Sequence, residues 1–246
     1  MRAPPPRSGL TVAAVLATLQ LAGCAGVSGV SMEDILTGAV PQRARPLDER
    51  TVAAGLREAL EVGARNAVRS TSRLNGFLGN SLIRIVLPPE LEKTGNALRS
   101  IGFGAQVEEL DLAMNRAAER AAGEATHVFI DAITRMSFQD AMGILHGEED
   151  AATQYLRRTT GDTLRARFEP IVDEKMREVG LVNLYDDLVG RLRALPLVPK
   201  PQIDLQDYVT DRTLDGLFHV MAEEEGRIRT DPSARVTDLL RTVFRD

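Results

Sequence analysis

The residues with the clearest potential for metal chemistry are Glu124 and His127, which stand three positions apart. On a helix this spacing places a carboxylate and an imidazole on one face, as in di-iron helical bundles. Such a centre needs a second Glu-x-x-His, but each of the other two histidines has a glycine three positions before it. Asp215, His219 and Glu223 also share a helical face, where we expect solvated side chains. We therefore predict no bound metal and no cofactor, with Glu124 and His127 as the only metal candidates.

The sequence contains no recognisable motif for nucleophilic catalysis or for dinucleotide binding. The sequence contains no Gly-x-Ser-x-Gly motif. The segment Gly102-Phe103-Gly104 lacks the third glycine of a dinucleotide-binding loop, because Val107 stands in that place. We predict no catalytic residue and do not expect an enzyme.

A set of polar residues at helical positions forms a candidate network or pocket. Its members are Asn115, Arg116, Glu119, Asp140, Thr153, Asp215 and Arg229. If they converge, they either fix the register of the helices or form the polar floor of a pocket for a small ligand or a lipid headgroup. The run Glu223-Glu224-Glu225 is expected on a solvated face instead.

The one cysteine of the chain, Cys24, follows a segment that predicts its chemistry. Residues 1–23 have a basic start and an apolar stretch over 10–21, which is typical of a signal peptide and too short to span a membrane. Leu21-Ala22-Gly23-Cys24 resembles the lipobox of bacterial lipoproteins. We expect cleavage between Gly23 and Cys24 and acylation of Cys24. Residues 24–46 are then the lipidated cysteine and a flexible tether.

The net charge of the chain and the residue after Cys24 indicate where in the cell the protein is expected. Removing residues 1–23 takes away two arginines and no acid, so the net charge of −5 becomes −7. An acidic chain without a basic patch is not expected to bind nucleic acid. Membrane attachment must come from the acyl chains on Cys24. Ala25 in place of an aspartate resembles the outer-membrane address of such lipoproteins, so we predict anchoring on the periplasmic face of the outer membrane.

The remainder, residues 47–246, is predicted to be a single, mainly α-helical domain. Aromatic residues make up only 4% of the chain and tryptophan is absent, which favours packed helices over a β-sandwich. Apolar and alanine positions recur at helical spacing over about 105–136 on most sides. We expect this stretch to be one buried helix at the centre of a bundle. The β-branched segment 82–87 is at most a minor extended or β segment.

Local signals place the other helices around this stretch. Expected helix starts are Asp48, Pro89, Ser137 with Asp140 as a capping box, Asp150 and Asp204. A further helix is expected from about 162 to 179, kinked or broken at Pro170. Residues 181–195 are amphipathic, and Asp231-Pro232 is expected to start the last helix.

Several sequence blocks together resemble one family. The blocks are Met114–Glu119, Ile144–Gly147 followed by Ala151–Thr153, Leu214–Phe218, and Glu224-Glu225 with Ile228-Arg229, Pro232 and Arg235. In this order they resemble the bacterial DUF4197 family over roughly residues 50 to 245. The resemblance implies a helical envelope protein, often a lipoprotein, and supplies no catalytic residues.

Three functions remain open on this evidence. The first is a binding or scaffold protein, which predicts a closed core and an exposed apolar patch. The second is a carrier or sensor of a lipid or small apolar ligand, which predicts a cavity lined by residues such as Phe129, Ile133, Leu217 and Phe218. The third is a metal-dependent enzyme.

Overall fold

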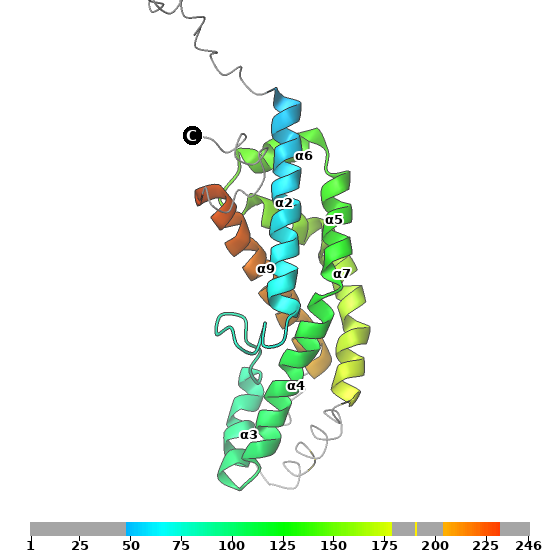
Figure 1. Ribbon diagram of the computed structural model, residues 1–246. Helices are drawn as coiled ribbons and strands as arrows, with labels where there is room; N and C mark the ends of the chain where they lie inside the picture. The colour runs from blue at the N-terminus through cyan, green and yellow to red at the C-terminus, as the bar shows by residue number, and fades with distance from the viewer. Residues whose placement is uncertain (1–47, 179–189, 191–203, 232–246) are drawn as a thin grey trace, which may run out of the picture. The chain divides into compact units, whose positions relative to one another are not determined.

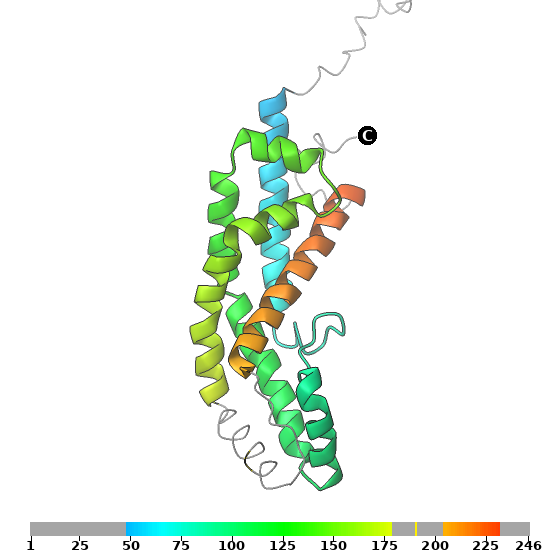
Figure 2. The same ribbon diagram turned by 180° about the vertical axis from the view of Figure 1, so that it is seen from behind.

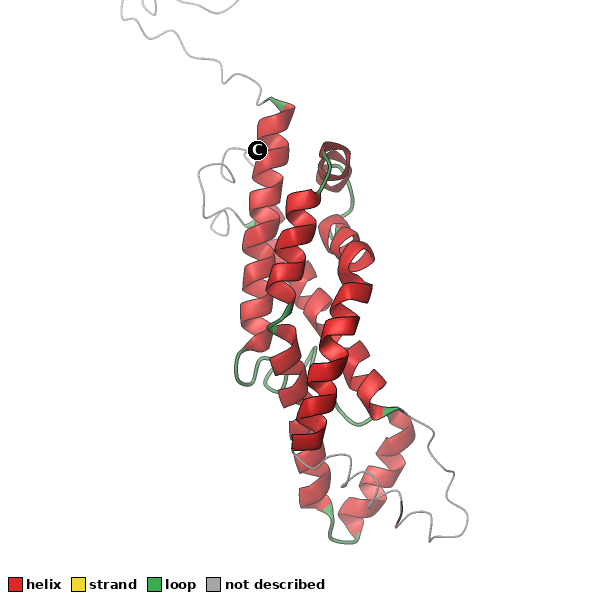
Figure 3. Cartoon of the chain, turned by 90° about the vertical axis from the view of Figure 1, so that its right-hand side faces the viewer, coloured by secondary structure: helices red, strands yellow, loops and turns green. Residues whose placement is uncertain are grey.

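The computed structural model describes residues 48–178, 190 and 204–231, which belong to one compact unit, Leu47–Asp246. Within these residues the chain forms helices joined by loops, and no strand is present (Figure 3). The predicted signal peptide, Cys24, the tether, the amphipathic segment 181–195 except residue 190, and the helix after Asp231-Pro232 lie outside the described residues. The mainly α-helical class predicted from the sequence is confirmed.

The described helices follow one another as shown in Figures 1 and 2. Their bounds are α2 Glu49–Ser72, α3 Pro89–Ser100, α4 Gly104–Ala122, α5 Ala125–Arg135, α6 Phe138–Leu145, α7 Ala151–Glu178 and α9 Leu205–Thr230. None of the helices in this part of the chain is long and apolar enough to cross a membrane.

Helices α4 and α9 lie at the centre of the packing. Helix α9 packs against α7, α2 and α4, and α4 also packs against α2, α3 and α7. The buried face of α4 is rich in alanine, including Ala113, Ala117 and Ala121, so neighbouring backbones approach closely. Larger side chains such as Phe129, Phe168 and Phe218 fill the spaces between the helices.

The predicted single helix over 105–136 is wrong in one respect, because it is two helices. Helix α4 ends at Ala122 and α5 begins at Ala125, with Gly123 and Glu124 forming a turn. The Glu124 N–H donates to the carbonyl of Ala121, three residues before it, whereas an α-helical hydrogen bond spans four residues. Gly123 has no side chain to stabilise a helix interior, so the periodic pattern continues through a real break.

The helix predicted after Asp150 and the further helix predicted over about 162–179 are one helix, α7. It runs without interruption from Ala151 to Glu178 and contains Pro170, where a kink or break was expected. It changes direction in its first half instead (Figure 2). There the hydroxyls of Thr159 and Thr160 donate to backbone carbonyls of the preceding turn, a pattern that bends helices.

The predicted caps of α2, α6 and α9 and the proline start of α3 are confirmed. The carboxylates of Asp48 and Asp204 accept the first free N–H groups of α2 and α9. Ser137 and Asp140 form the capping box of α6. Pro89 is the first residue of α3, and the segment before it is an extended connection rather than a strand.

The packing of α9 against the loop after α2 yields a prediction at Gly216. A Cβ there would lie 2.6 Å from Cε1 of Phe77 and 3.1 Å from Cβ of Ile83, and both side chains are buried. We expect Gly216→Ala to destabilise the protein by about 1–3 kcal/mol because the core must shift to admit it. The measurement is the free energy of unfolding in urea.

Gly226 in the same helix is the matched control. A Cβ there meets nothing within 4 Å. Gly226→Ala should stabilise the helix by about 0.5–1 kcal/mol. Equal effects of the two substitutions would contradict the close packing at Gly216.

Candidate functional site

Two side chains on α4 hold the loop that connects α2 to α3, residues 73–88, which we call the pinned loop. Asn115 is fully buried and pairs with both backbone groups of Ile85. The Ile85 N–H donates to Oδ1 of Asn115 over 2.9 Å, and Nδ2 of Asn115 donates to the Ile85 carbonyl over 2.7 Å. The amide thus takes the place of a neighbouring strand, so the extended segment needs no sheet partner.

Glu119, one turn further along α4, holds the first half of the pinned loop. Its Oε1 accepts hydrogen bonds from the backbone N–H groups of Phe77 and Leu78, at 3.2 and 3.3 Å. Its Oε2 pairs with Arg116 over 2.5 Å. Arg116 in turn donates to the side chain of Asn75, whose φ of 62° is uncommon outside glycine. The buried carboxylate is therefore satisfied on both oxygens.

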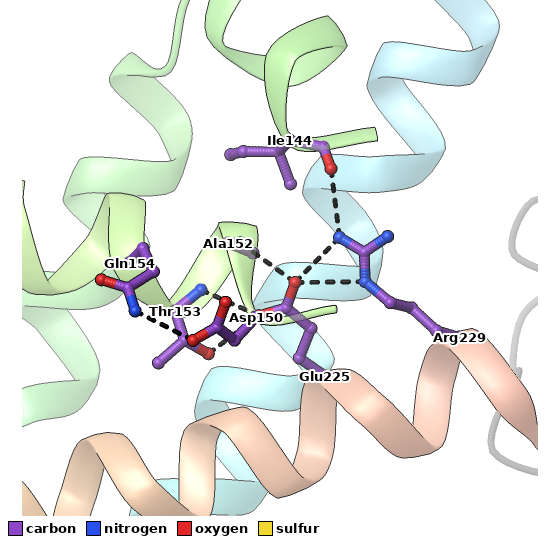
Figure 4. Close-up of polar contacts among 7 residues, drawn as sticks. All are labelled: Ile144, Asp150, Ala152, Thr153, Gln154, Glu225 and Arg229. Atoms are coloured by element: carbon purple, nitrogen blue, oxygen red, sulfur yellow. Dashed lines mark hydrogen bonds and ion pairs between the residues drawn. The ribbon is translucent and has the colours of Figure 1, made fainter. Parts of the chain in front are cut away.

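A second cluster ties α6 and α7 to α9 (Figure 4). One oxygen of Glu225 accepts from the Ala152 N–H, and the other accepts from the N–H and the hydroxyl of Thr153, at 2.8–3.0 Å. Arg229 pairs with Glu225 over 2.9 Å and donates to the Ile144 carbonyl. The carboxylate of one helix thereby caps the start of another, as the helix dipole favours.

The predicted cap of α7, Asp150, does not act as one. Its side chain accepts instead from the side chain of Gln154 (Figure 4). The solvated face predicted for the glutamate run is also wrong for Glu224 and Glu225, which are 8% and 4% exposed. The helical stripe of Leu217, Met221 and Ile228 continues through positions 224 and 225, and this spacing was the missed signal.

The seven predicted polar residues therefore do not converge into one network. Asn115, Arg116 and Glu119 act together at the pinned loop, and Thr153 and Arg229 act at the start of α7. Asp140 is partly exposed in its capping box, where the hydrogen bonds from the Ser137 hydroxyl and backbone lower the pKa of its carboxyl. Asp215 is exposed and pairs with Arg157 over 3.0 Å.

The metal candidates lie at an exposed helix start. Glu124 precedes α5 without capping it, and His127 lies in the first turn of that helix. Among the residues that the structure describes, no group of three or more histidine, cysteine or acidic side chains could hold a metal ion. His219 pairs with Glu223 at 3.6 Å on an exposed face.

The space in which an apolar ligand was expected is filled by side chains. Phe129, Ile133, Leu217 and Phe218 are all buried. The rings of Phe129 and Phe218 pack edge to face, with centroids 5.7 Å apart. These contacts favour a closed core.

Two hollows open at other places on the described domain. One, of about 470 Å³, lies between α5 and α7 and is lined mostly by polar side chains such as His127, Asp131 and Arg135. The other, of about 560 Å³, is lined by α3, α4, the start of α9 and the end of the pinned loop. The second contains Asp111, which the sequence did not single out.

The fold and these contacts define a helical bundle in which buried acceptors hold irregular backbone. Residues 46–245 match the model of the family described as "Protein of unknown function (DUF4197)", and the chain belongs to that family. No curated protein and no solved structure matches the chain significantly.

The capping contact at Glu225 yields a stability prediction. Glu225→Ala removes the acceptor of two helix N–H groups and the carboxylate that pairs with Arg229, whose side chain is only 19% exposed. We expect a loss of about 3–5 kcal/mol, as for other broken buried pairs. Chemical unfolding measures it.

Glu223→Ala, two residues away, is the matched control, because the Glu223 side chain is 37% exposed and its partner His219 is 47% exposed. Its effect should stay within about 0.5 kcal/mol. If the two variants unfold at the same urea concentration, Glu225 is not the cap described above.

Proposed function

We propose that this chain is an outer-membrane lipoprotein whose helical domain faces the periplasm and binds a protein partner. The lipobox-like segment and the single Cys24 support the anchor. The pinned loop supports the binding role, and it is the observation that carries the proposal.

The pinned loop presents apolar side chains to solvent on a fixed backbone. Leu74, Leu82 and Val86 are 73%, 65% and 52% exposed, and they are half of the large hydrophobic side chains exposed in the described residues. The contacts of Asn115 and Glu119 hold the backbone on both sides of Leu82. Tyr208 of α9 donates to the Val86 carbonyl. An apolar surface held in one conformation loses little entropy on binding.

Charge indicates the chemistry of the partner. The pinned loop carries Arg73 and Arg84, both exposed, and contains no acidic residue, although the whole chain has a net charge of −5. A complementary surface is apolar with acidic residues at its rim. The aromatic side chain of the loop, Phe77, is fully buried, so the loop lacks the exposed aromatics that favour insertion at a membrane interface. These features favour a protein partner.

The anchor is tested by Cys24→Ser. Serine offers no thiolate for acylation, so we expect the variant to lose its lipid and to move from the membrane fraction to the soluble periplasmic fraction. Mass spectrometry of the protein purified from cells reads the acyl groups directly. An unmodified Cys24 with residues 1–23 still attached would refute the assigned compartment.

The docking surface is tested by a photo-crosslinking residue at position 82 in cells, with position 101 as control. Ile101 is 64% exposed but lies outside the pinned loop. We expect an adduct with one protein of another sequence at 82 and not at 101. The same adduct at both positions, an adduct with lipid or an adduct with a second copy of the chain would overturn the proposal.

The partner identified in this way is then purified and its affinity measured. Leu74→Glu should weaken binding at least about tenfold, because it places a charge in an apolar interface. Leu112→Glu is the matched control on exposed surface of α4, since Leu112 is 42% exposed. The affinity should also fall as salt is added. Equal losses from the two substitutions would contradict docking at the pinned loop.

A further inference from the structure

The hollow between α3, α4 and α9, which we call the Asp111 pocket, combines opposite charges in a small volume. It measures about 560 Å³ and its walls come from elements far apart in the sequence. Val86, Leu87 and Pro89 form an apolar side, and Asn96, Arg99, Asp111 and Arg212 are among its polar residues. A pocket of this size takes a small molecule.

One oxygen of the Asp111 carboxylate, Oδ1, lacks a hydrogen-bond partner of good geometry. The side chain of Asp111 is 13% exposed, and Oδ1 is buried. Its Oδ2 lies 3.7 Å from Nη2 of Arg99, an ion-pair distance beyond that of a good hydrogen bond. Burial raises the pKa of this carboxyl, although Arg99, Arg84 and the backbone N–H of Leu87 act in the opposite direction. A buried acceptor of this kind is unfavourable unless a donor reaches it.

The other side of the Asp111 pocket offers positive charge. Arg212 lines the pocket, is exposed, and forms no ion pair with the acids of the described residues. Nη1 of Arg99 donates to the side chain of Asn96, and Nη2 of Arg99 lies 3.7 Å from the carboxylate of Asp111. The guanidinium groups can therefore receive an anionic group while Asp111 receives a donor.

The hollow between α5 and α7 does not combine these features. Its carboxylate, Asp131, is already paired with Arg135 over 3.0 Å, and both side chains are largely exposed. Only the Asp111 pocket contains a buried acceptor without a hydrogen-bond partner of good geometry among the pockets of the described domain considered above.

We propose that the Asp111 pocket binds a small molecule that carries a hydrogen-bond donor, an ammonium or a hydroxyl, close to an anionic group, a carboxylate or a phosphate. The Asp111 carboxylate accepts from the donor, and Arg212 with Arg99 holds the anion. Free α-amino acids and hydroxylated phosphates share this chemistry. The evidence for this site does not depend on the proposed anchor or on the proposed partner at the pinned loop.

The test measures binding of L-alanine and of glycerol 3-phosphate to the full chain as purified from cells, by saturation-transfer NMR and calorimetry. Acetate and glycerol, which carry the anion or the donor alone, are the control probes. We expect at least one of the two-group probes to bind with a Kd of about 1 mM or tighter, and the control probes to bind at least about tenfold more weakly. No transfer to either two-group probe at about 10 mM would overturn the proposal.

Substitutions assign the binding to the pocket. Asp111→Leu and Arg212→Gln should each weaken it at least about tenfold, and Arg120→Gln, at an exposed arginine elsewhere on α4, should leave it unchanged. Asp111→Asn separates the two ligand sources, because an amide retains an acceptor for a hydroxyl but no charge for an ammonium. Unchanged binding in Asp111→Leu would refute the site.

A stability measurement shows whether a loss of binding in Asp111→Leu comes from the altered pocket or from unfolding of the variant. Since the folded pKa of Asp111 is raised above its ordinary 3.8, the wild type loses stability as the pH rises from below 3.8 through the raised value. Asp111→Leu lacks this loss, so its stability relative to the wild type should increase from about pH 3 to about pH 7. A variant that is unfolded at neutral pH would show that Asp111 has a structural partner and would contradict the proposal.

Discussion

Irregular backbone inside a helical bundle has to find hydrogen-bond partners, and in this protein buried side chains provide them. A helix satisfies its own N–H and carbonyl groups, but a loop packed against helices does not. Asn115 and Glu119 on α4 accept from Phe77, Leu78 and Ile85 of the pinned loop. Without these acceptors the loop could not lie against the core, because each unpaired buried group costs about 1–3 kcal/mol.

The same solution appears at the start of α7. Glu225 of α9 accepts the free N–H groups of Ala152 and Thr153, and Arg229 balances its charge. A polar contact across two helices also fixes their register, because the bonds form in one alignment only. The sequence blocks that resemble the family contain Asn115, Glu119, Thr153, Gly216 and Glu225. The resemblance therefore lies largely in residues that position the bundle.

Features that depend on neighbours in sequence could be predicted, and features that depend on distant partners could not. Asp48, Ser137 and Asp204 cap the helices that follow them, because a cap needs only the next few residues. The cap of α7 comes from Glu225, more than seventy residues away, and this acceptor displaced the expected Asp150. Nothing in the local sequence distinguishes these two carboxylates.

The break at Gly123 and the continuity at Pro170 show the same limit. Apolar periodicity runs through 105–136, but it reports which face is buried and does not require an unbroken helix. Pro170 removes one helical hydrogen bond, an effect of about 3 kcal/mol or more that was expected to end the helix. Phe168 and Val172, on either side of it, are fully buried, and this packing holds α7 in one piece.

Asp111 was overlooked for a related reason. Its position on α4 is one turn before Asn115, and its backbone carbonyl accepts a hydrogen bond from Nδ2 of Asn115. The burial of its side chain, however, follows from α3 and α9, which meet there only in the folded chain. A carboxylate on a charged helix is indistinguishable in sequence from a solvated one.

The pinned loop and the Asp111 pocket share a wall, and this links the two proposed surfaces physically. Val86 is exposed as part of the loop and also lines the pocket, and Tyr208, another lining residue, donates to its carbonyl. A molecule in the pocket would contact the segment that presents Val86 and Leu82. Because Asn115 already holds Ile85 in place, the effect of such a molecule on the loop would be to favour one side-chain arrangement rather than to order the backbone. Coupling between the two surfaces then requires a difference in ligand affinity between those arrangements, and Val86 is the residue through which it would pass.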